Sequence, residues 1–223
     1  MKKYIKYLLV IVLLALSLIF YLMLKKNDLN KSIDNTINLK DKINYSTSIT
    51  LEINDSYTSS KIQYDSIKSG NIKKINIINY IDDKKKNSIV KYEVGNTTYV
   101  YNGKDYDVQK SSNDDFNINY ELLKEKMLKI ESVKDNEYIV KMKACDAYNI
   151  LYSNEVMSKN DIDAIIYLKI VVDKDTNFIK KISYEIDNLN NSEYKNNMVS
   201  YKVDIENNDI NNHDEIKLPF EKK

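Results

Sequence analysis

The stretch VVDKDTNFIKKISYEI, Val171 to Ile186, decides between a metal site and a turn, and with that the class of fold. Three polar residues recur at alternate positions in it, as they do at the start of a calcium-binding EF loop: Asp173, Asp175 and Asn177. Such a loop needs Gly at its sixth position and a bidentate Glu at its twelfth. Those positions hold Phe178 and Tyr184 here. We therefore predict a turn and no metal site.

The residues on both sides of this turn alternate between two faces, which is typical of half-buried strands. The apolar positions of one parity are Ile166, Leu168, Ile170 and Val172 before the turn, and Phe178, Ile182, Tyr184 and Ile186 after it. Asp, Asn and Thr clustered between two such runs favour a hairpin connection. The stretch thus predicts two antiparallel strands.

Further alternating runs predict a long series of strands. Their apolar positions are Ile49, Leu51 and Ile53; Ile62 and Tyr64; Ile75, Ile77 and Ile81; Val90, Tyr92 and Val94; Tyr99 and Tyr101; Tyr106 and Val108; Tyr138, Val140 and Met142; Val199, Tyr201, Val203 and Ile205. Gly95-Asn96 predicts a hairpin turn, and Asn102-Gly103 predicts one of type I′. The acidic pairs Asp82/Asp83 and Asp114/Asp115 are expected to be solvated turns.

Three segments have helical spacing instead. Leu29, Ile33 and Ile37 predict a short amphipathic helix near the N-terminus. A second apolar stripe consists of Phe116, Tyr120, Leu123, Met127 and Ile130, and a third of Ala144, Tyr148, Leu151 and Tyr152. The second stripe is too short for a coiled coil, so we expect that helix to lie on a sheet.

The composition limits what single residues can mean. The 223 residues include no Trp and 19 Tyr, and every one of the 34 basic residues is Lys. Asn, Ile, Lys and Tyr have A/T-rich codons, so their abundance indicates a low-G+C genome rather than a tyrosine cage or a nucleic-acid patch. Five lysines lie in the first 26 residues, which hold no acid, so the remainder is mildly acidic. We expect no nucleic-acid partner, since such a protein needs a basic face.

An uncharged run from Tyr7 to Leu24, bracketed by lysines, is the strongest signal in the chain. It is long enough to span a bilayer core, which takes about 17–25 residues. A cleavable signal peptide is the alternative, because Ala15-Leu16-Ser17 resembles a cleavage site. Seven more apolar residues follow that site, however, where a signal peptide should have ended.

We therefore expect an uncleaved membrane anchor, residues 1–26, in which Tyr7–Leu24 spans the cell membrane and contacts the lipid bilayer. The only cysteine, Cys145, lies far from this end, which excludes a lipoprotein signal. Because lysines lie on both sides of the apolar run, the positive-inside rule does not decide its orientation. Short lysine-bearing N-termini usually stay inside, so we expect a cytoplasmic N-terminus and an extracytoplasmic domain.

Residues 27–223 have a size that suits one β-rich domain with its own core, and no repeat or Pro-rich linker divides them. Many sequential antiparallel strands with inserted helices predict the α+β class. We expect one large curved antiparallel sheet, a half-barrel, with helices packed on its concave face. One N-terminal transmembrane helix precedes it.

This order of elements resembles the LolA/LppX-like group of extracytoplasmic carriers and related small envelope lipoproteins of Gram-positive bacteria. VDKDTNFIKKISYEI is similar to their late hairpin, and DEIKLP, Asp214 to Pro219, to their short closing strand. The chain lacks their lipid-bearing Cys, so its helix must attach it. The resemblance implies an apolar cavity between sheet and helices that can hold acyl chains. No catalytic residues carry over.

Two functions stay open. In the first, the half-barrel holds a lipid or another hydrophobic ligand beneath the Phe116–Ile130 helix. Its candidate lining residues are Ile182, Tyr184, Ile186, Tyr201 and Val203. A Tyr ring suits such a pocket because its body is apolar while its hydroxyl can reach a headgroup. In the second, the core is filled, and a tethered cell-envelope protein acts through surface contacts with partners that the sequence does not name.

The sequence contains no Gly-rich phosphate loop, nucleophile elbow or His/Cys/acid cluster. Cys145 and the single histidine, His213, are a conceivable nucleophilic pair, but no group that would orient His213 can be identified. We expect Cys145 to be a small buried thiol and His213 a solvated loop residue. We accordingly expect no enzyme activity, cofactor or metal.

Overall fold

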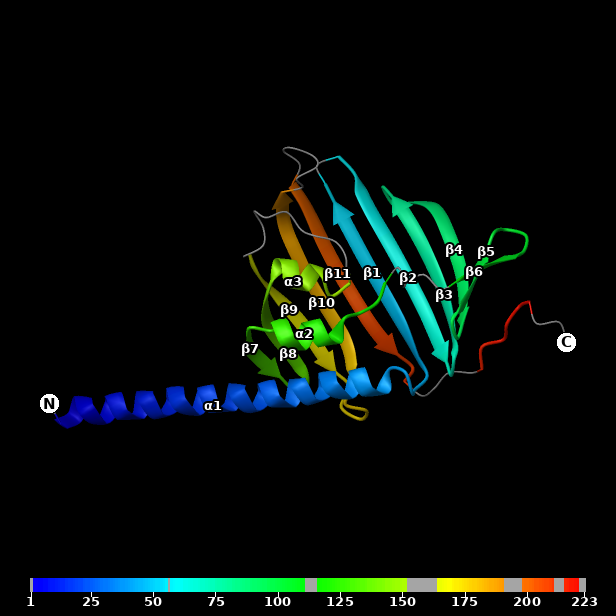
Figure 1. Ribbon diagram of the computed structural model, residues 1–223. Helices are drawn as coiled ribbons and strands as arrows, with labels where there is room; N and C mark the ends of the chain where they lie inside the picture. The colour runs from blue at the N-terminus through cyan, green and yellow to red at the C-terminus, as the bar shows by residue number, and fades with distance from the viewer. Residues whose placement is uncertain are drawn as a thin grey trace.

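A computed structural model describes residues 2–55, 57–110, 116–151, 164–190, 198–210 and 215–220. Its strands form one 11-stranded sheet in the order β6-β5-β4-β3-β2-β1-β11-β10-β9-β8-β7 (Figure 1). The first six are β1 (Tyr45–Asn54), β2 (Ser59–Ser69), β3 (Ile72–Ile81), β4 (Lys84–Val94), β5 (Thr97–Tyr101) and β6 (Tyr106–Lys110). The others are β7 (Lys129–Lys134), β8 (Glu137–Lys143), β9 (Ile165–Val172), β10 (Ile179–Asn190) and β11 (Met198–Asn208). All neighbouring strands are antiparallel, as predicted.

The chain builds this sheet from two meanders. It runs outward from β1 to β6, crosses to the far edge at β7, and returns strand by strand to β11, which pairs with β1. The crossing segment passes over one face and contains the helix α2 (Tyr120–Lys126). Phe116 of this segment packs on Tyr64 of β2, with ring centroids 5.4 Å apart.

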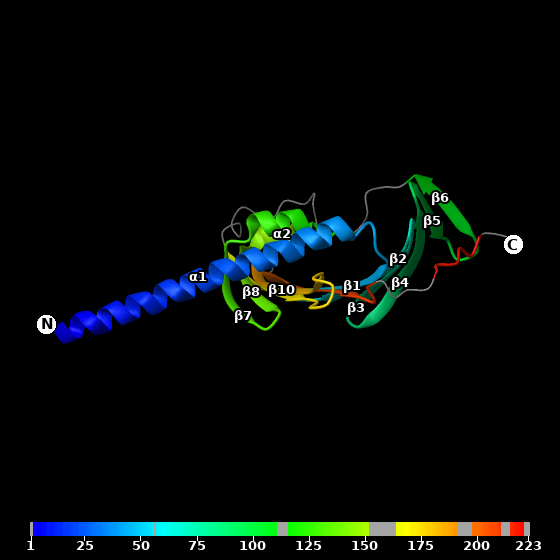
Figure 2. The ribbon, with the colours of Figure 1, turned by 90° about the horizontal axis from the view of Figure 1, so that it is seen from below.

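Helices cover one face of the sheet only, as Figure 2 shows for α2 and the C-terminal half of α1 (Lys2–Leu39). The third helix is α3 (Ala144–Tyr148). Inward-pointing residues of the central strands are almost fully buried beneath them, as period-2 alternation requires: Ile49, Leu51, Val140, Leu168, Ile170, Ile182, Val203 and Ile205. The opposite face carries ion pairs, for example between Lys181 Nζ and Glu206 Oε1 at 2.6 Å.

The apolar N-terminal run and the predicted amphipathic helix are one continuous helix, α1. Leu29 and Ile33 are fully buried in the core. The N-terminal half of α1 projects away from the sheet (Figure 1). Every large apolar side chain from Tyr7 to Leu24 except Leu22 is 45–67 % exposed. This is the one helix in the described part of the chain that is long and apolar enough to cross a membrane.

The hairpin predicted at Val171–Ile186 is confirmed as the β9–β10 connection. Asn177 takes a left-handed conformation (φ 53°), and its backbone N–H donates to Asp173 O at 2.9 Å. The turn packs on α1, where Ser32 Oγ donates to Asn177 Oδ1 at 2.6 Å. Thr36 Oγ1 accepts the N–H of Ile179 at 2.9 Å. Polar contacts therefore attach the C-terminal half of α1 to the start of β10.

The helix predicted for Phe116–Ile130 is wrong at both ends, because α2 covers only Tyr120–Lys126. Asn119 caps its start, accepting the N–H of Leu122 at 2.9 Å, and Met127 is extended (ψ 112°). Ile130 lies in β7, a strand that the sequence analysis missed. A register shift between Ile130 and Ser132 interrupts the alternation by which a strand is recognised.

One connection and the tail differ from expectation, while Asp82/Asp83 is an exposed turn as predicted. Asn102-Gly103 is part of a longer loop, in which Asn102 Oδ1 accepts the N–H groups of Lys104 and Asp105. Asp82-Asp83 is the tight turn, with φ of 48° and 60° as type I′ requires. Residues 215–220 form no strand, and Asp214, like Asp114/Asp115, lies outside the described residues. The tail instead stacks Phe220 on Tyr99, with centroids 4.1 Å apart.

Candidate functional site

The structure brings the five candidate lining residues together on the helix-covered face. Ile182, Tyr184 and Ile186 follow one another along β10, and their partners on β11 are Ile205, Val203 and Tyr201. Tyr184 is only 5 % exposed, and the other residues except Tyr201 are buried at least as deeply. Tyr201 is half-buried and packs against the core from its edge. The five form one continuous apolar surface.

The helix above this surface is α3 rather than the predicted Phe116–Ile130 helix. Tyr184 Oη donates a buried hydrogen bond of 2.8 Å to the carbonyl of Ala147. The ring of Tyr148 meets that of Tyr201 edge-on, with centroids 5.5 Å apart and an interplanar angle of 82°. Both candidate tyrosines are thus held by α3, which begins directly after β8 and has five residues.

A strip of half-buried apolar side chains extends this surface at its open side, and we call it the apolar rim: Ile53, Ile62, Tyr148 and Tyr201. Ile53 of β1 is the register partner of Tyr201 of β11. Ile62 of β2 is the register partner of the buried Leu51 on β1. The rim is therefore continuous with the core, while its own side chains remain partly open to solvent.

A buried polar network closes the other end of the covered face. Asn207 is 1 % exposed; its Nδ2 donates to Tyr120 Oη at 2.9 Å and to Ile179 O at 2.8 Å. Its Oδ1 accepts the hydroxyl of Thr47 at 2.8 Å. Burial raises the pKa of Tyr120, so this phenol stays neutral. A cavity of about 50 Å³ beside the network, lined in part by Tyr64, Phe116 and Asn207, is far smaller than a ligand pocket.

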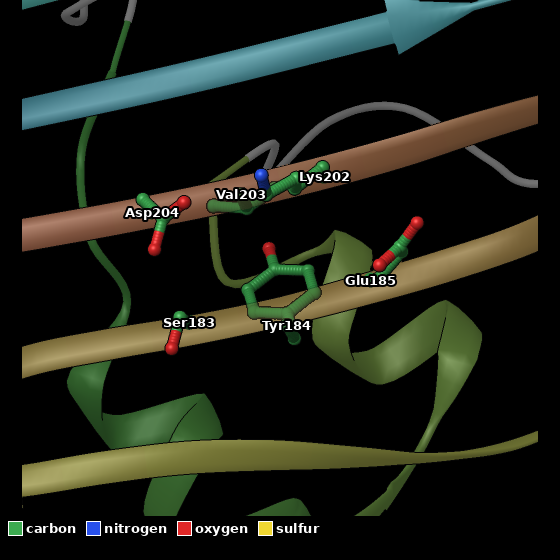
Figure 3. A pocket seen from close by; sticks show the side chains of 6 residues that line it. All are labelled: Ser183, Tyr184, Glu185, Lys202, Val203 and Asp204. Atoms are coloured by element: carbon green, nitrogen blue, oxygen red, sulfur yellow. The ribbon is translucent and has the colours of Figure 1, made fainter.

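Two further hollows are open to solvent and are lined mainly by polar and charged residues. One, of about 270 Å³, lies on β10 and β11 (Figure 3) and is lined by Ser183, Tyr184, Glu185, Lys202, Val203 and Asp204. Side chains alternate between faces, so its polar members lie opposite the candidate lining residues. The other, of about 510 Å³, runs between α1 and α2, where Lys124 Nζ pairs with Asp34 Oδ1 at 2.5 Å. Neither hollow resembles an apolar ligand site.

The other chemistry-bearing residues serve local structure. Asp173 Oδ1 accepts hydrogen bonds from the N–H and the hydroxyl of Thr176 at 2.9 and 2.8 Å, which lower the pKa of its carboxyl. Cys145 in α3 is half-buried rather than buried as predicted, and this partial burial raises the pKa of its thiol. His213 lies outside the described residues. Within the part of the chain that the structure describes, no three His, Cys, Asp or Glu residues are grouped to hold a metal ion.

Sequence reasoning missed the partners of the candidate residues. Tyr148 was placed on a helix but not beside Tyr201, because the pairing depends on how the short α3 turns back over the sheet. Asn207 carried no signal, since it is one Asn among many in a biased composition. The rim residues Ile53 and Ile62 had a usable signal, because both belong to the inward parity of predicted strands.

No protein-family model matches the chain, and no curated protein matches it. Among solved structures, it is similar to LprF from Mycobacterium bovis, with 9% sequence identity and a TM-score of 0.47, over 86% of this chain and 97% of that chain. It is similar at lower level to a DUF1329 family protein from Desulfovibrio piger, with 11% identity and a TM-score of 0.27, over 81% of this chain and 91% of that chain.

Proposed function

We propose that the protein is a membrane-anchored extracytoplasmic binding protein. Residues 1–26 are the anchor, with Tyr7–Leu24 across the bilayer and the N-terminus in the cytoplasm, and residues 27–223 are one domain outside. The exposed apolar side chains of α1 support this assignment, because in water they would be an unusually large apolar surface.

The continuity of α1 makes the tether stiff and short. At 1.5 Å per residue, Leu29 lies only about 8 Å along the helix from Leu24. Leu29 is fully buried in the domain, and Leu22, inside the apolar run, already packs against the core. The domain is therefore held directly at the membrane surface rather than on a flexible linker.

We further propose that the sheet is a half-barrel and that a lipid acyl chain, or a similar hydrophobic ligand, binds between α3 and strands β10 and β11. The observation that carries this is the apolar rim, which leaves half-exposed Ile and Tyr side chains continuous with the core. The view in Figure 2 supports the half-barrel, since β5 and β6 rise toward the side on which α2 lies.

Entry over the rim requires α3 to move. An entering chain would replace the contact of Tyr148 with Tyr201 and then reach Tyr184, whose hydrogen bond to Ala147 holds α3 down. The helix is only five residues long, and displacing it would expose Ala144 and Ala147, which are fully buried. The Tyr201 ring would pack on the chain while its hydroxyl stays near water or a headgroup.

A second candidate function is favoured by the packing seen in this structure. Tyr184 is almost fully buried, its hydroxyl is satisfied, and the cavity at the other end of the covered face holds only about 50 Å³. A tethered cell-envelope protein with a filled core would have these features, and it would act through its surface.

Photolabelling of the full chain in lipid vesicles tests the proposal. A fatty acid that carries a diazirine is added, the sample is irradiated, and the labelled peptides are identified by mass spectrometry. We expect labels both in Tyr7–Leu24, from the surrounding bilayer, and in the peptides of Ile53, Tyr148 and Tyr201. Ile53→Lys should remove the second set, while Val108→Lys, at an exposed position on the edge strand β6, should leave it unchanged.

Each part of the proposal can fail separately. Labels confined to Tyr7–Leu24 would leave the tethered protein with a filled core. A chain without labels in Tyr7–Leu24, or with a mature N-terminus at Leu18, would refute the anchor.

A further inference from the structure

The edge of the sheet formed by β7, β8 and β9 carries exposed apolar side chains that the proposed binding site does not use. Leu128 is 49 %, Ile165 47 % and Tyr167 54 % exposed. Ile165 and Tyr167 are two residues apart on β9 and therefore share a face. Leu128 immediately precedes β7 and donates its N–H to Lys141 O at 3.0 Å.

Lysines are interleaved with these side chains. Lys129, Lys141 and Tyr167 are successive partners across β7, β8 and β9, and Lys143 is the partner of Ile165. Lys141 Nζ lies 5.5 Å from the centroid of the Tyr167 ring. One carboxylate, Glu131, pairs with both Lys141 at 2.7 Å and Lys129 at 3.4 Å. The surface, which we call the edge patch, is apolar and basic: Leu128, Lys129, Lys141, Lys143, Ile165 and Tyr167.

The edge patch lies at the end of the domain from which the apolar half of α1 projects. In both ribbon views, β7 is the strand nearest that end (Figures 1 and 2). Residues of α1 contact residues of β7, so the two elements lie close together. Lys25 follows the apolar run directly.

We propose that the edge patch rests on the surface of an anionic lipid bilayer, with Tyr167, Ile165 and Leu128 in the headgroup region and the lysines on lipid phosphates. This inference rests on the proposed tether. The α1 span already places the bilayer within about 8 Å of the domain, so the nearest surface for the patch is the membrane.

The composition fits that occupant. Tyr rings concentrate at the membrane–water interface because one end is apolar and the other polar. Lysine stems pack along apolar surface while their ammonium groups reach the phosphates. An anionic surface attracts lysines that lie within a Debye length of it. Contact with headgroups would also shield the free edge of β7, which otherwise offers unpaired backbone groups to another chain.

The chain has no Trp, so a single introduced Trp reports its own surroundings. The full chain is reconstituted into nanodiscs that contain a brominated phosphatidylcholine, which quenches Trp by contact, with and without phosphatidylglycerol. Three variants are compared: Tyr167→Trp in the edge patch, Leu14→Trp in the span, and Val108→Trp as the matched control. Val108 is also exposed and apolar, at 67 %, but it lies on β6 at the opposite edge of the sheet.

We expect strong quenching at position 14, clear quenching at 167 that increases with phosphatidylglycerol, and none at 108. Quenching at 14 with no more at 167 than at 108 would refute the edge patch while leaving the tether in place. No quenching at 14 would refute the tether and this inference with it. Equal quenching at 167 with and without phosphatidylglycerol would refute the role of the lysines.

Discussion

Removing the Tyr184 side chain tests whether α3 is a movable helix above a ligand site or a fixed part of a filled core. Tyr184 is 5 % exposed within the core, and replacing a buried aromatic ring by Ala costs about 3–5 kcal/mol when the site cannot collapse. Tyr184→Phe keeps the ring and removes the hydrogen bond to Ala147, whose carbonyl still accepts the N–H of Ile150 at 3.2 Å, so the cost is that of one buried hydrogen bond, about 0.5–1.5 kcal/mol. For a domain of this size each kcal/mol lowers the melting temperature by roughly 2–4 °C.

Tyr101→Phe is the matched control for the hydrogen bond. Tyr101 Oη also donates to a backbone carbonyl at 2.8 Å, that of Gly103, but the bond is exposed. Water replaces the lost partner there, so we expect a change within about 0.5 kcal/mol. The assay is thermal unfolding of each full-length variant in one detergent, followed by far-ultraviolet circular dichroism.

The pair of outcomes decides the role of α3. We expect Tyr184→Ala to lower the melting temperature by on the order of 10 °C and Tyr184→Phe by clearly more than Tyr101→Phe. If the Tyr184 hydroxyl holds α3 in place, Tyr184→Phe should also increase photolabelling at the apolar rim. A Tyr184→Phe variant as stable as the wild type, with unchanged labelling, would show that this hydrogen bond does not hold α3 in place.

The remaining predictions concern the buried network and the β9–β10 turn. Asn207→Leu leaves Thr47 and the Ile179 carbonyl without a partner and should cost about 2–5 kcal/mol in urea unfolding, whereas Asn87→Leu, at an exposed position, should cost less than about 0.5 kcal/mol. Millimolar calcium should not change the melting temperature, because a site on the folded state alone would add about 2.7 kcal/mol at a hundredfold excess over Kd. Asp173 has a lowered pKa in the folded state, so its contribution is complete above its unfolded value of about 3.9 and is lost as the pH falls below it. Asp173→Asn should therefore lower stability at pH 7 and leave it nearly unchanged at pH 2, as measured by melting curves at both values.

The inward face of the sheet could be predicted because alternation needs only local information. Ile182, Tyr184 and Ile186 share a parity in the sequence, and so do Val199, Tyr201 and Val203; one rule then places all of them on one side. Which residues meet across β10 and β11, such as Tyr184 and Val203, depends on the register of the two strands, and alternation alone does not give that register.

The positions of the helices over the sheet could not be predicted in the same way. The apolar stripe from Phe116 to Ile130 has helical spacing, but its last member belongs to a strand whose alternation is interrupted by a register shift. Tertiary pairing with β8 outweighs local helical preference there. Chain order also gives no hint that β11 returns to pair with β1, because that pairing joins residues more than a hundred positions apart. The placement of α3 over Tyr184 depends both on the pairing of β7 with β8 and on the pairing of β11 with β1.

The shared helix α1 makes attachment and folding two uses of one element. Leu29 and Ile33 fill the core, Ser32 and Asn35 hold the β9–β10 turn, and the same helix continues without a break into the apolar run. Turning the domain about this helix would separate Leu29 and Ile33 from the sheet, so the orientation of the sheet relative to the bilayer is set by core packing. A flexible linker would let any surface meet the membrane, whereas the proposed span of α1 would present one edge, that of β7. If α1 spans the bilayer as proposed, the apolar rim, on strands β1, β2 and β11 and on α3, would be held at a constant position relative to the lipid surface, as uptake of a ligand from that surface would require.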